Sequence, residues 1–246
     1  MVVVCDNMVD VMAITQFSSR VSKITFFNHK FCLVHLELIK PSRFSFVAGQ
    51  YILLDVPGTE QKKSYSIASA PEMSHAIELL VDISPGGVGC EYIKKLKPGD
   101  SVTFRGPVGA FVIDQSQGKE LVFVATGSGI SSLRSMLLDQ LITRGDKRKI
   151  RLYWGLRYVT DLFWEEDFYQ MDEDYENLEV EIILSRPPDE WKLSSGYVTD
   201  ALQVLEKDFS SKSYYLCGGA SMIQDVRALL EKKGVLAGNI HFEKYY

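Results

Sequence analysis

The sequence predicts two domains, an antiparallel β-barrel followed by a doubly wound parallel α/β sheet. Before residue 116, short apolar stretches alternate with turns rich in glycine, proline and aspartate, which is typical of a small barrel. After it, strand-like and helix-like stretches alternate, which is the rhythm of a parallel sheet with crossover helices. The link between the halves is polar. We therefore expect an N-terminal tail at residues 1–17, the barrel domain at 18–116 and the α/β domain at 117–246.

The barrel half is expected to contain short strands and one helix. Residues 31–38 show the clearest alternation between two faces, and Pro-Gly pairs at 57–58 and 98–99 mark turns. The expected strands cover residues 20–26, 31–38, 51–56, 77–83 and 101–104, and the expected helix covers residues 91–96.

The second half is expected to alternate strictly between strand and helix. Helical periodicity is clearest where Leu133, Met136, Leu137 and Leu141 recur after a buried strand. The expected strands cover residues 120–125, 150–154, 178–184, 214–217 and 240–243. The expected helices cover residues 131–143, 162–171, 197–205 and 221–233.

Composition excludes several function classes. The 246 residues are 46% hydrophobic and 24% charged, with a net charge of −5, so a broad basic surface for nucleic acid is not indicated. No stretch reaches the length of a membrane span. The four cysteines, Cys5, Cys32, Cys90 and Cys217, lie far apart, which argues against a metal or iron–sulfur site and against a disulfide scaffold. We expect no metal and a cytoplasmic location.

Two glycine turns follow predicted strands. The first is Thr126-Gly127-Ser128-Gly129, and the second is Gly218-Gly219 directly after Cys217. Such turns let phosphate approach the backbone and the positive end of a helix, although a strand-to-helix turn can also be a mere connection. Carboxyl ends of parallel strands share one edge of a sheet, so both turns are expected to flank one crevice. Taken alone, Cys217 is more commonly a buried thiol that packs in the core as a small hydrophobic residue.

The order of the motifs carries a family resemblance. They are Gly49-Gln50-Tyr51, Lys63-Ser64-Tyr65-Ser66, a glycine-rich loop at 85–90, Gly106-Pro107-Val108-Gly109, the two turns above, and Glu243 near a C-terminal aromatic. In this order the chain resembles the ferredoxin–NADP reductase superfamily. Residues 153–157 are most similar to small bacterial flavin reductases, and residues 185–187 and 196–200 to bacterial oxygenase and ferredoxin reductases.

The resemblance implies that the barrel binds a flavin, which we expect to be FAD, with FMN as the alternative. It places Tyr65 against the flavin ring and the Ser66 hydroxyl near flavin N5. Lys63 matches the family arginine that holds the pyrophosphate, and Cys90 replaces the Ser or Thr of the phosphate loop. Because both changes touch the same phosphates, we expect looser flavin binding. The phosphate-loop residues implied are Gly86, Gly87, Gly89 and Cys90.

The resemblance also implies that the second domain binds NADH or NADPH. It places Cys217 near nicotinamide C4 and makes Ser66, Cys217 and Glu243 the catalytic set, which orients the rings. Tyr245 or Tyr246 would cover the flavin and yield to nicotinamide, unless they form a frayed end. The acidic stretch after Ser185-Arg186 favours NADH. The nucleotide-binding residues implied are Thr126, Gly127, Ser128, Gly129, Ser185, Arg186, Cys217, Gly218, Tyr245 and Tyr246.

Three functions follow from these expectations. The first is an NAD(P)H oxidoreductase that moves hydride from nicotinamide to flavin N5 and passes electrons to a separate acceptor, such as a ferredoxin or an oxygenase component. Because the cysteines are dispersed, any iron–sulfur partner is expected to be another chain. The second is a flavin reductase that uses flavin as a diffusible substrate. The third, of another class, is a catalytically silent module that keeps only the fold.

Overall fold

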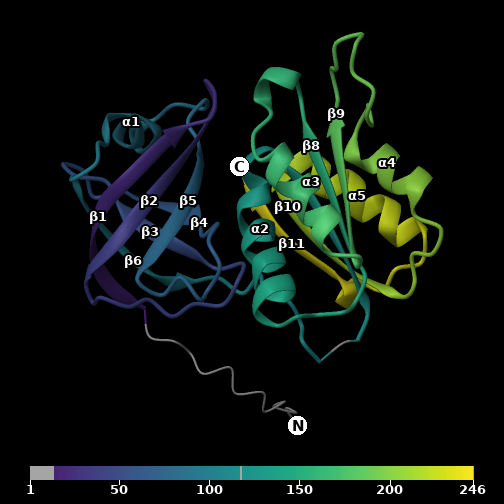
Figure 1. The fold of residues 1–246 in the computed structure, drawn as a ribbon, viewed down its shortest axis with the longest axis horizontal. Coiled ribbons are helices and arrows are strands. Elements are labelled where there is room, and N and C mark those ends of the chain that lie inside the picture. Colours follow the sequence, from purple (N-terminus) through teal and green to yellow (C-terminus); the bar gives the residue numbers. More distant parts are fainter. Residues whose placement is uncertain (1–13, 117, 246) are drawn as a thin grey trace.

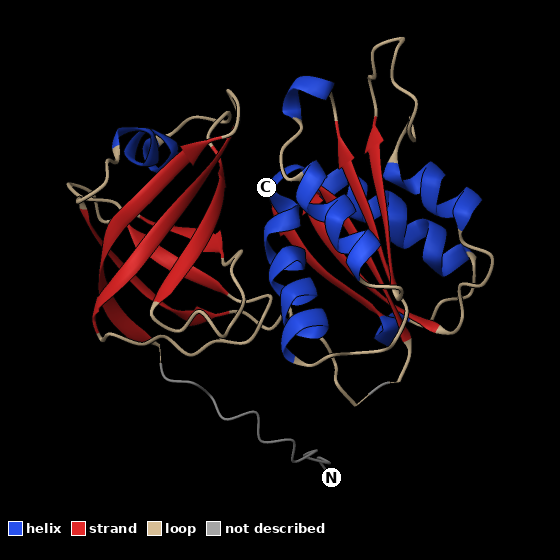
Figure 2. Cartoon of the chain, in the orientation of Figure 1, coloured by secondary structure: helices blue, strands red, loops and turns tan. Residues whose placement is uncertain are grey.

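The computed structural model describes residues 14–116 and 118–245, which form two domains side by side (Figure 1). The expectations for Cys5, for residues 1–13 of the tail and for Tyr246 lie outside the described residues. The predicted fold, an antiparallel barrel followed by a parallel α/β sheet, is confirmed (Figure 2).

The first domain is a nearly closed antiparallel barrel of six strands in the order β4-β3-β6-β1-β2-β5. The ends of the sheet meet through a bridge between Ile67 and Leu79, so the barrel has almost no free edge. Phe44 and Phe104 are fully buried in its core. The strands are β1 (Thr15–Phe26), β2 (Phe31–Lys40), β3 (Tyr51–Asp55), β4 (Lys62–Ser66), β5 (Ala76–Asp82) and β6 (Ser101–Val108), and helix α1 covers Val88–Lys95.

Three details of the barrel differ from the prediction. Strand β4 was not expected, because Lys62 and Ser64 face solvent and the segment lacks apolar alternation; pairing with β3 makes it a strand. Strand β1 begins at Thr15, so residues 15–17 belong to a strand rather than to a tail. Helix α1 begins three residues earlier than expected, at Val88, because Gly87 caps it.

The second domain is a five-stranded parallel sheet in the order β11-β10-β7-β8-β9. Helices α2 and α3 pack on one face, and α4 and α5 on the other, which is the doubly wound arrangement. The strands are β7 (Glu120–Thr126), β8 (Ile150–Leu156), β9 (Leu178–Leu184), β10 (Lys212–Gly219) and β11 (Ile240–Tyr245). The helices are α2 (Ile130–Leu138), continued by a π-helical turn (Asp139–Thr143), α3 (Glu165–Asp174), α4 (Val198–Leu205) and α5 (Ala220–Lys232).

The two domains share part of one hydrophobic core. Phe31, Ala68 and Leu80 of the barrel belong to the same buried cluster as residues of α2 and β8. Helix α3 begins three residues later than expected, because a short helical turn (Val159–Asp161) and Trp164, whose φ of 57° is left-handed, precede it. Among the described residues, no helix is long and apolar enough to cross a membrane.

Candidate functional site

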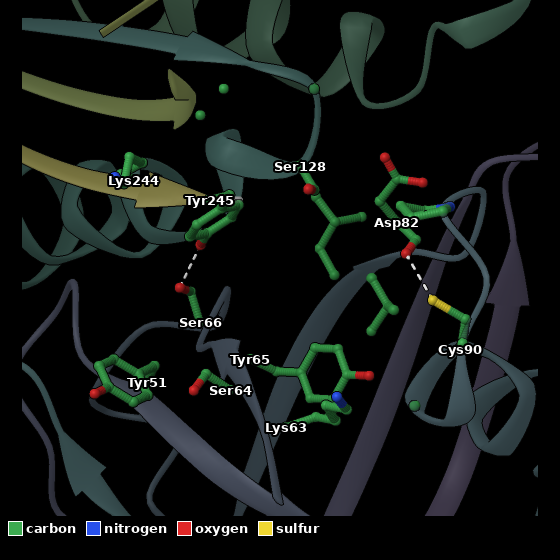
Figure 3. A pocket seen from close by; sticks show the side chains of 18 of the residues that line it. Tyr51, Lys63, Ser64, Tyr65, Ser66, Asp82, Cys90, Ser128, Lys244 and Tyr245 are labelled. Carbon is green, nitrogen blue, oxygen red and sulfur yellow. Dashed lines mark hydrogen bonds between the residues drawn. The ribbon is translucent and has the colours of Figure 1, made fainter. Parts of the chain in front are cut away.

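A cleft of about 910 Å³ lies between the two domains, where the end of β4 faces the carboxyl ends of β7 and β10 (Figure 3). The barrel contributes fourteen of the lining residues and the α/β domain eight, and both supply glycine-rich backbone and polar side chains. Its lining comprises Tyr51, Lys63, Ser64, Tyr65, Ser66, Leu80, Val81, Asp82, Pro85, Gly86, Gly87, Val88, Gly89, Cys90, Thr126, Gly127, Ser128, Gly218, Gly219, Glu243, Lys244 and Tyr245.

Strand β4 carries the Tyr65 ring and the Lys63 ammonium group on the same face. Lys63 and Tyr65 are two residues apart, so the strand's alternation points both side chains the same way, and both are half-buried. Gly89 of α1 packs closely against this face, because a Cβ there would lie 2.8 Å from both Lys63 Cγ and the Tyr65 hydroxyl. A larger residue at 89 would therefore press on both side chains.

The phosphate-loop candidate turns directly into α1. Gly86 and Gly87 have φ values of 74° and 86°, a conformation that favours glycine, and no heavy atom would meet a Cβ at either residue within 4 Å. Gly87 caps α1 without a side-chain hydrogen bond. Open backbone at the start of a helix suits an anion. The Cys90 thiol instead donates to the Asp82 carbonyl at 3.6 Å, and burial raises its pKa, so it faces the cleft as a neutral group.

The two glycine turns of the sheet are locked together. Thr126 Oγ1 accepts a hydrogen bond from the Gly219 N–H at 3.2 Å. A Cβ at Gly129 would overlap the carbonyl oxygen of Cys217, so only glycine permits this approach of the two backbones. Both turns thus meet at the point where the strand order reverses, the usual ligand crevice of such sheets.

Strand β11 carries two functional candidates back to the barrel. Its pairing with β10 sets Glu243 beside Cys217 and Tyr245 beside Gly219. The Ser66 hydroxyl donates to Glu243 Oε2 at 3.3 Å, and the Tyr245 hydroxyl donates to Ser66 Oγ. Burial raises the pKa of the Glu243 carboxyl, and the Ser66 bond partly opposes that rise.

Cys217 lies behind this group rather than in the cleft. Its side chain is fully buried, and burial raises the pKa of its thiol to about 12. The side chains of Ser132 and Tyr245 lie next to the thiol and lower its pKa slightly against the effect of burial. The neutral thiol therefore packs against the side chain of Tyr245.

Most of the predicted site residues meet in this cleft. Gly129 and Cys217 lie just behind its wall, whereas Ser185 and Arg186 follow β9 and are not among its lining residues. Arg186 instead donates to the Tyr158 hydroxyl at 3.2 Å. Among the lining residues that were not predicted from the sequence are Tyr51, Gly219 and Lys244, although Tyr51 and Gly219 lie inside motifs that the sequence shows.

These residues fit a flavin and a nicotinamide dinucleotide. Tyr65 supplies an aromatic face beside the Ser66 hydroxyl, and Lys63 with the Gly86-Gly87 backbone supplies positive charge and N–H donors for phosphates. A second set of glycines, Gly127, Gly218 and Gly219, lines the same cleft from the sheet domain, and of these Gly219 would meet no other heavy atom within 4 Å if it carried a Cβ.

Comparison with known proteins agrees with this fit. Residues 18–113 match the family model of the oxidoreductase FAD-binding domain, and residues 123–228 match that of the oxidoreductase NAD-binding domain. The chain is 34% identical over 211 residues to ferredoxin–NADP reductase B of Sorangium cellulosum, covering 82% of this chain and 86% of that protein. The chain belongs to the ferredoxin–NADP reductase superfamily.

Other members of the superfamily are longer. The reductase component DmpP of phenol 2-monooxygenase from Pseudomonas sp. (strain CF600) is 35% identical over 217 residues, which are 87% of this chain but 61% of that protein. The crystal structure of the Amycolatopsis cytochrome P450 reductase GcoB superposes with a TM-score of 0.87 at 27% identity, covering 94% of this chain and 70% of that one. This chain thus spans about three fifths of the phenol 2-monooxygenase component.

Proposed function

We propose that this chain is an NAD(P)H-dependent flavoprotein reductase that passes electrons to an acceptor outside its 246 residues. The observation that carries the proposal is the single cleft in which Tyr65 and Ser66 of the barrel face the two glycine turns of the nucleotide-type sheet. A bound flavin would supply the redox chemistry, taking a hydride from the nicotinamide and releasing electrons onward.

The chain's own residues would bind and orient. Tyr65 would stack on the flavin ring, and Lys63 with Gly86, Gly87 and Gly89 would hold the pyrophosphate. The Gly127–Gly129 and Gly218 turns would hold the dinucleotide phosphates. Tyr245 would occupy the nicotinamide position until the coenzyme enters, while Ser66 and Glu243 would fix the polar edge of the site.

The test is the visible absorbance spectrum of the purified protein, recorded anaerobically before and after addition of NADH or NADPH. We expect flavin bands that bleach with a reduced coenzyme. A protein that binds no flavin in titration would contradict the proposal and would favour a silent module that keeps only the fold.

A second candidate is a flavin reductase that releases its flavin. It is favoured by Lys63, which lacks the two-pronged guanidinium of arginine, and by Cys90, whose thiol is turned to Asp82. Gel filtration separates the two candidates. Flavin that co-elutes with the protein supports the electron-transfer reductase, and flavin lost on the column supports the flavin reductase.

We propose NADH as the preferred coenzyme. Arg186 is tied to Tyr158, and Asp189 and Glu190 follow closely, which disfavours a 2′-phosphate. Steady-state kinetics with both coenzymes test this, and a strong preference for NADPH would overturn it. The acceptor is proposed to be a ferredoxin or an oxygenase component, by analogy with the oxygenase reductases, and the location to be cytoplasmic.

A further inference from the structure

One face of helix α2 is hydrogen-bonded to the barrel backbone at residues 66–69, which are the last residue of the Lys63–Ser66 motif and the three residues after it. Residues 131, 134 and 135 share this face, because residues three and four apart are neighbours on a helix. Each donates a hydrogen bond to a carbonyl of the barrel segment 66–69. The bonds join Ser131 to Ser66 (3.0 Å), Arg134 to Ala68 (2.8 Å) and Ser135 to Ser69 (2.7 Å).

Arg134 makes more contacts between the domains than either serine. Its Nη1 donates both to the Ala68 carbonyl and to Glu78 Oε2, at 3.0 Å. Glu78 lies on β5 at the seam where the barrel closes, since its own carbonyl accepts the Ala68 N–H at 2.8 Å. Arg134 is therefore bonded to the barrel where β4 and β5, the two end strands of its sheet, come together.

The same guanidinium also lies over the ring of Trp164, with its Cζ 4.5 Å from the ring centroid. Trp164 is the one non-glycine residue in the described chain with positive φ, a conformation that its surroundings must stabilise. Its ring also contacts Phe27 of the barrel, with centroids 5.5 Å apart. Arg134 thus stabilises the segment that leads from β8 to α3.

We propose that Arg134 is a positioning residue that holds the Gly127–Gly129 turn and Ser66 at a fixed separation. Helix α2 starts directly after the Gly127–Gly129 turn, and Arg134 ties that helix to the backbone two residues beyond Ser66. A shift of α2 relative to the barrel would move the two binding sites apart. This inference rests on the proposed function and concerns ring alignment rather than binding.

The test compares Arg134→Ala and Arg134→Lys with the unaltered protein. Misplacement of reacting groups by about 1 Å can cost about 100-fold in rate, so we expect flavin reduction at saturating NADH to fall about 10- to 100-fold in Arg134→Ala. Flavin content and the KM for NADH should stay within about two-fold, because Arg134 touches neither site. Arg134→Lys keeps the charge but loses the planar fork and the stacking, so an intermediate rate is expected.

A second measurement does not depend on activity. In the flavin-free protein, amide hydrogen exchange should speed up at residues 66–69 and 157–164 in Arg134→Ala. Arg144→Ala is the matched control, because Arg144 ends the same helical element and is bonded to Asp139. It should leave both the exchange and the rate unchanged.

An unchanged reduction rate in Arg134→Ala, or a raised KM at an unchanged rate, would overturn the proposal. If Arg134→Ala does not fold, Arg134→Lys decides, and a wild-type rate in that variant overturns it too. Failure of the unaltered protein to reduce bound flavin would instead contradict the proposed function, and the exchange measurement would still report whether Arg134 joins the domains.

Discussion

The two sides of the cleft are built differently. On the barrel side, Lys63 and Tyr65 are half-buried and line the cleft, and a Cβ at Gly86 or Gly87 would meet no other atom within 4 Å. On the sheet side, the two turns meet through the Gly219 N–H bond to Thr126 Oγ1 and the close approach of Gly129 to the Cys217 carbonyl, and Tyr245 lies next to the buried Cys217. Under the proposed function, the flavin side would therefore be preformed, with Lys63 as its one side-chain cation among the phosphate-binding residues, whereas the nicotinamide side would be tightly packed and closed by Tyr245, which would have to move.

Glycine replacement should reveal this difference most strongly. We expect Gly129→Ala to lower coenzyme-driven flavin reduction by more than about 100-fold, because its Cβ would overlap the Cys217 carbonyl and force the turn out of place. Gly89→Ala meets only side-chain atoms, at 2.8 Å, and should raise the flavin Kd by less than about ten-fold.

Anaerobic stopped-flow absorbance measures the first effect, and reduction by dithionite serves as its control. Dithionite needs no nucleotide site, so it should reduce the flavin of Gly129→Ala normally. Equal loss of NADH-driven rate in the two glycine variants would show that the sides of the cleft do not differ in rigidity.

Cys217→Ala tests whether the buried thiol of Cys217 holds the side chain of Tyr245 in place. We expect about a ten-fold slower hydride transfer with unchanged flavin content, because loss of the thiol removes a partner of Tyr245 and leaves a cavity. Cys32→Ala is the matched control, since Cys32 is equally buried in the barrel core, with its pKa also raised to about 12. Unchanged stopped-flow reduction in Cys217→Ala would remove Cys217 from the site.

The fold was largely predictable, and the site only in part. Apolar alternation and helical periodicity suffice to predict the barrel and the parallel sheet, because both patterns are local. Strand β4 was missed because its exposed positions are Lys62 and Ser64, which carry no apolar signal. The bond between Ser66 and Tyr245 joins residues 179 positions apart and depends on domain docking, which no local pattern encodes.

The interdomain contacts of α2 were hidden for another reason. Ser131, Arg134 and Ser135 form a polar face that, in the sequence, looks like the solvent side of an amphipathic helix. Ser131 and Ser135 are buried against the barrel instead. In the sequence, these contacts are marked only by three polar residues at positions i, i+3 and i+4 directly after the Gly127–Gly129 turn. This pattern indicates a domain interface only when a second domain is known to lie against the helix.

We expect Glu243 to make the stability of the sheet side of the cleft depend on pH. Burial raises the pKa of the Glu243 carboxyl in the folded state. Between the ordinary glutamate pKa of about 4.3 and the raised value, the folded chain binds more protons than the unfolded chain. The free energy of unfolding therefore falls as pH rises through this range. Glu243→Gln removes the ionisation. We expect it to raise the free energy of unfolding by up to about 1 kcal/mol at pH 7 and to change it little at pH 4.

Urea unfolding at the two pH values checks this, with Glu231→Gln, on the exposed side of α5, as the control. A stability difference that is the same at both pH values would mean that the Glu243 carboxyl does not titrate with a raised pKa.

The smallest effect is expected on the flavin side, from Lys63→Arg. A guanidinium can donate two parallel hydrogen bonds to a phosphate where an ammonium acts as a point charge, so the Kd of FAD should fall about three- to ten-fold. Lys62→Arg is the matched control, because Lys62 precedes Lys63 on β4 and faces solvent. Fluorescence titration of the flavin-free protein with FAD measures both variants. A tightening confined to Lys63→Arg would assign the weak phosphate contact to this position, and equal affinity in all three proteins would show that Lys63 does not reach the pyrophosphate and that the Gly86-Gly87 backbone holds it alone.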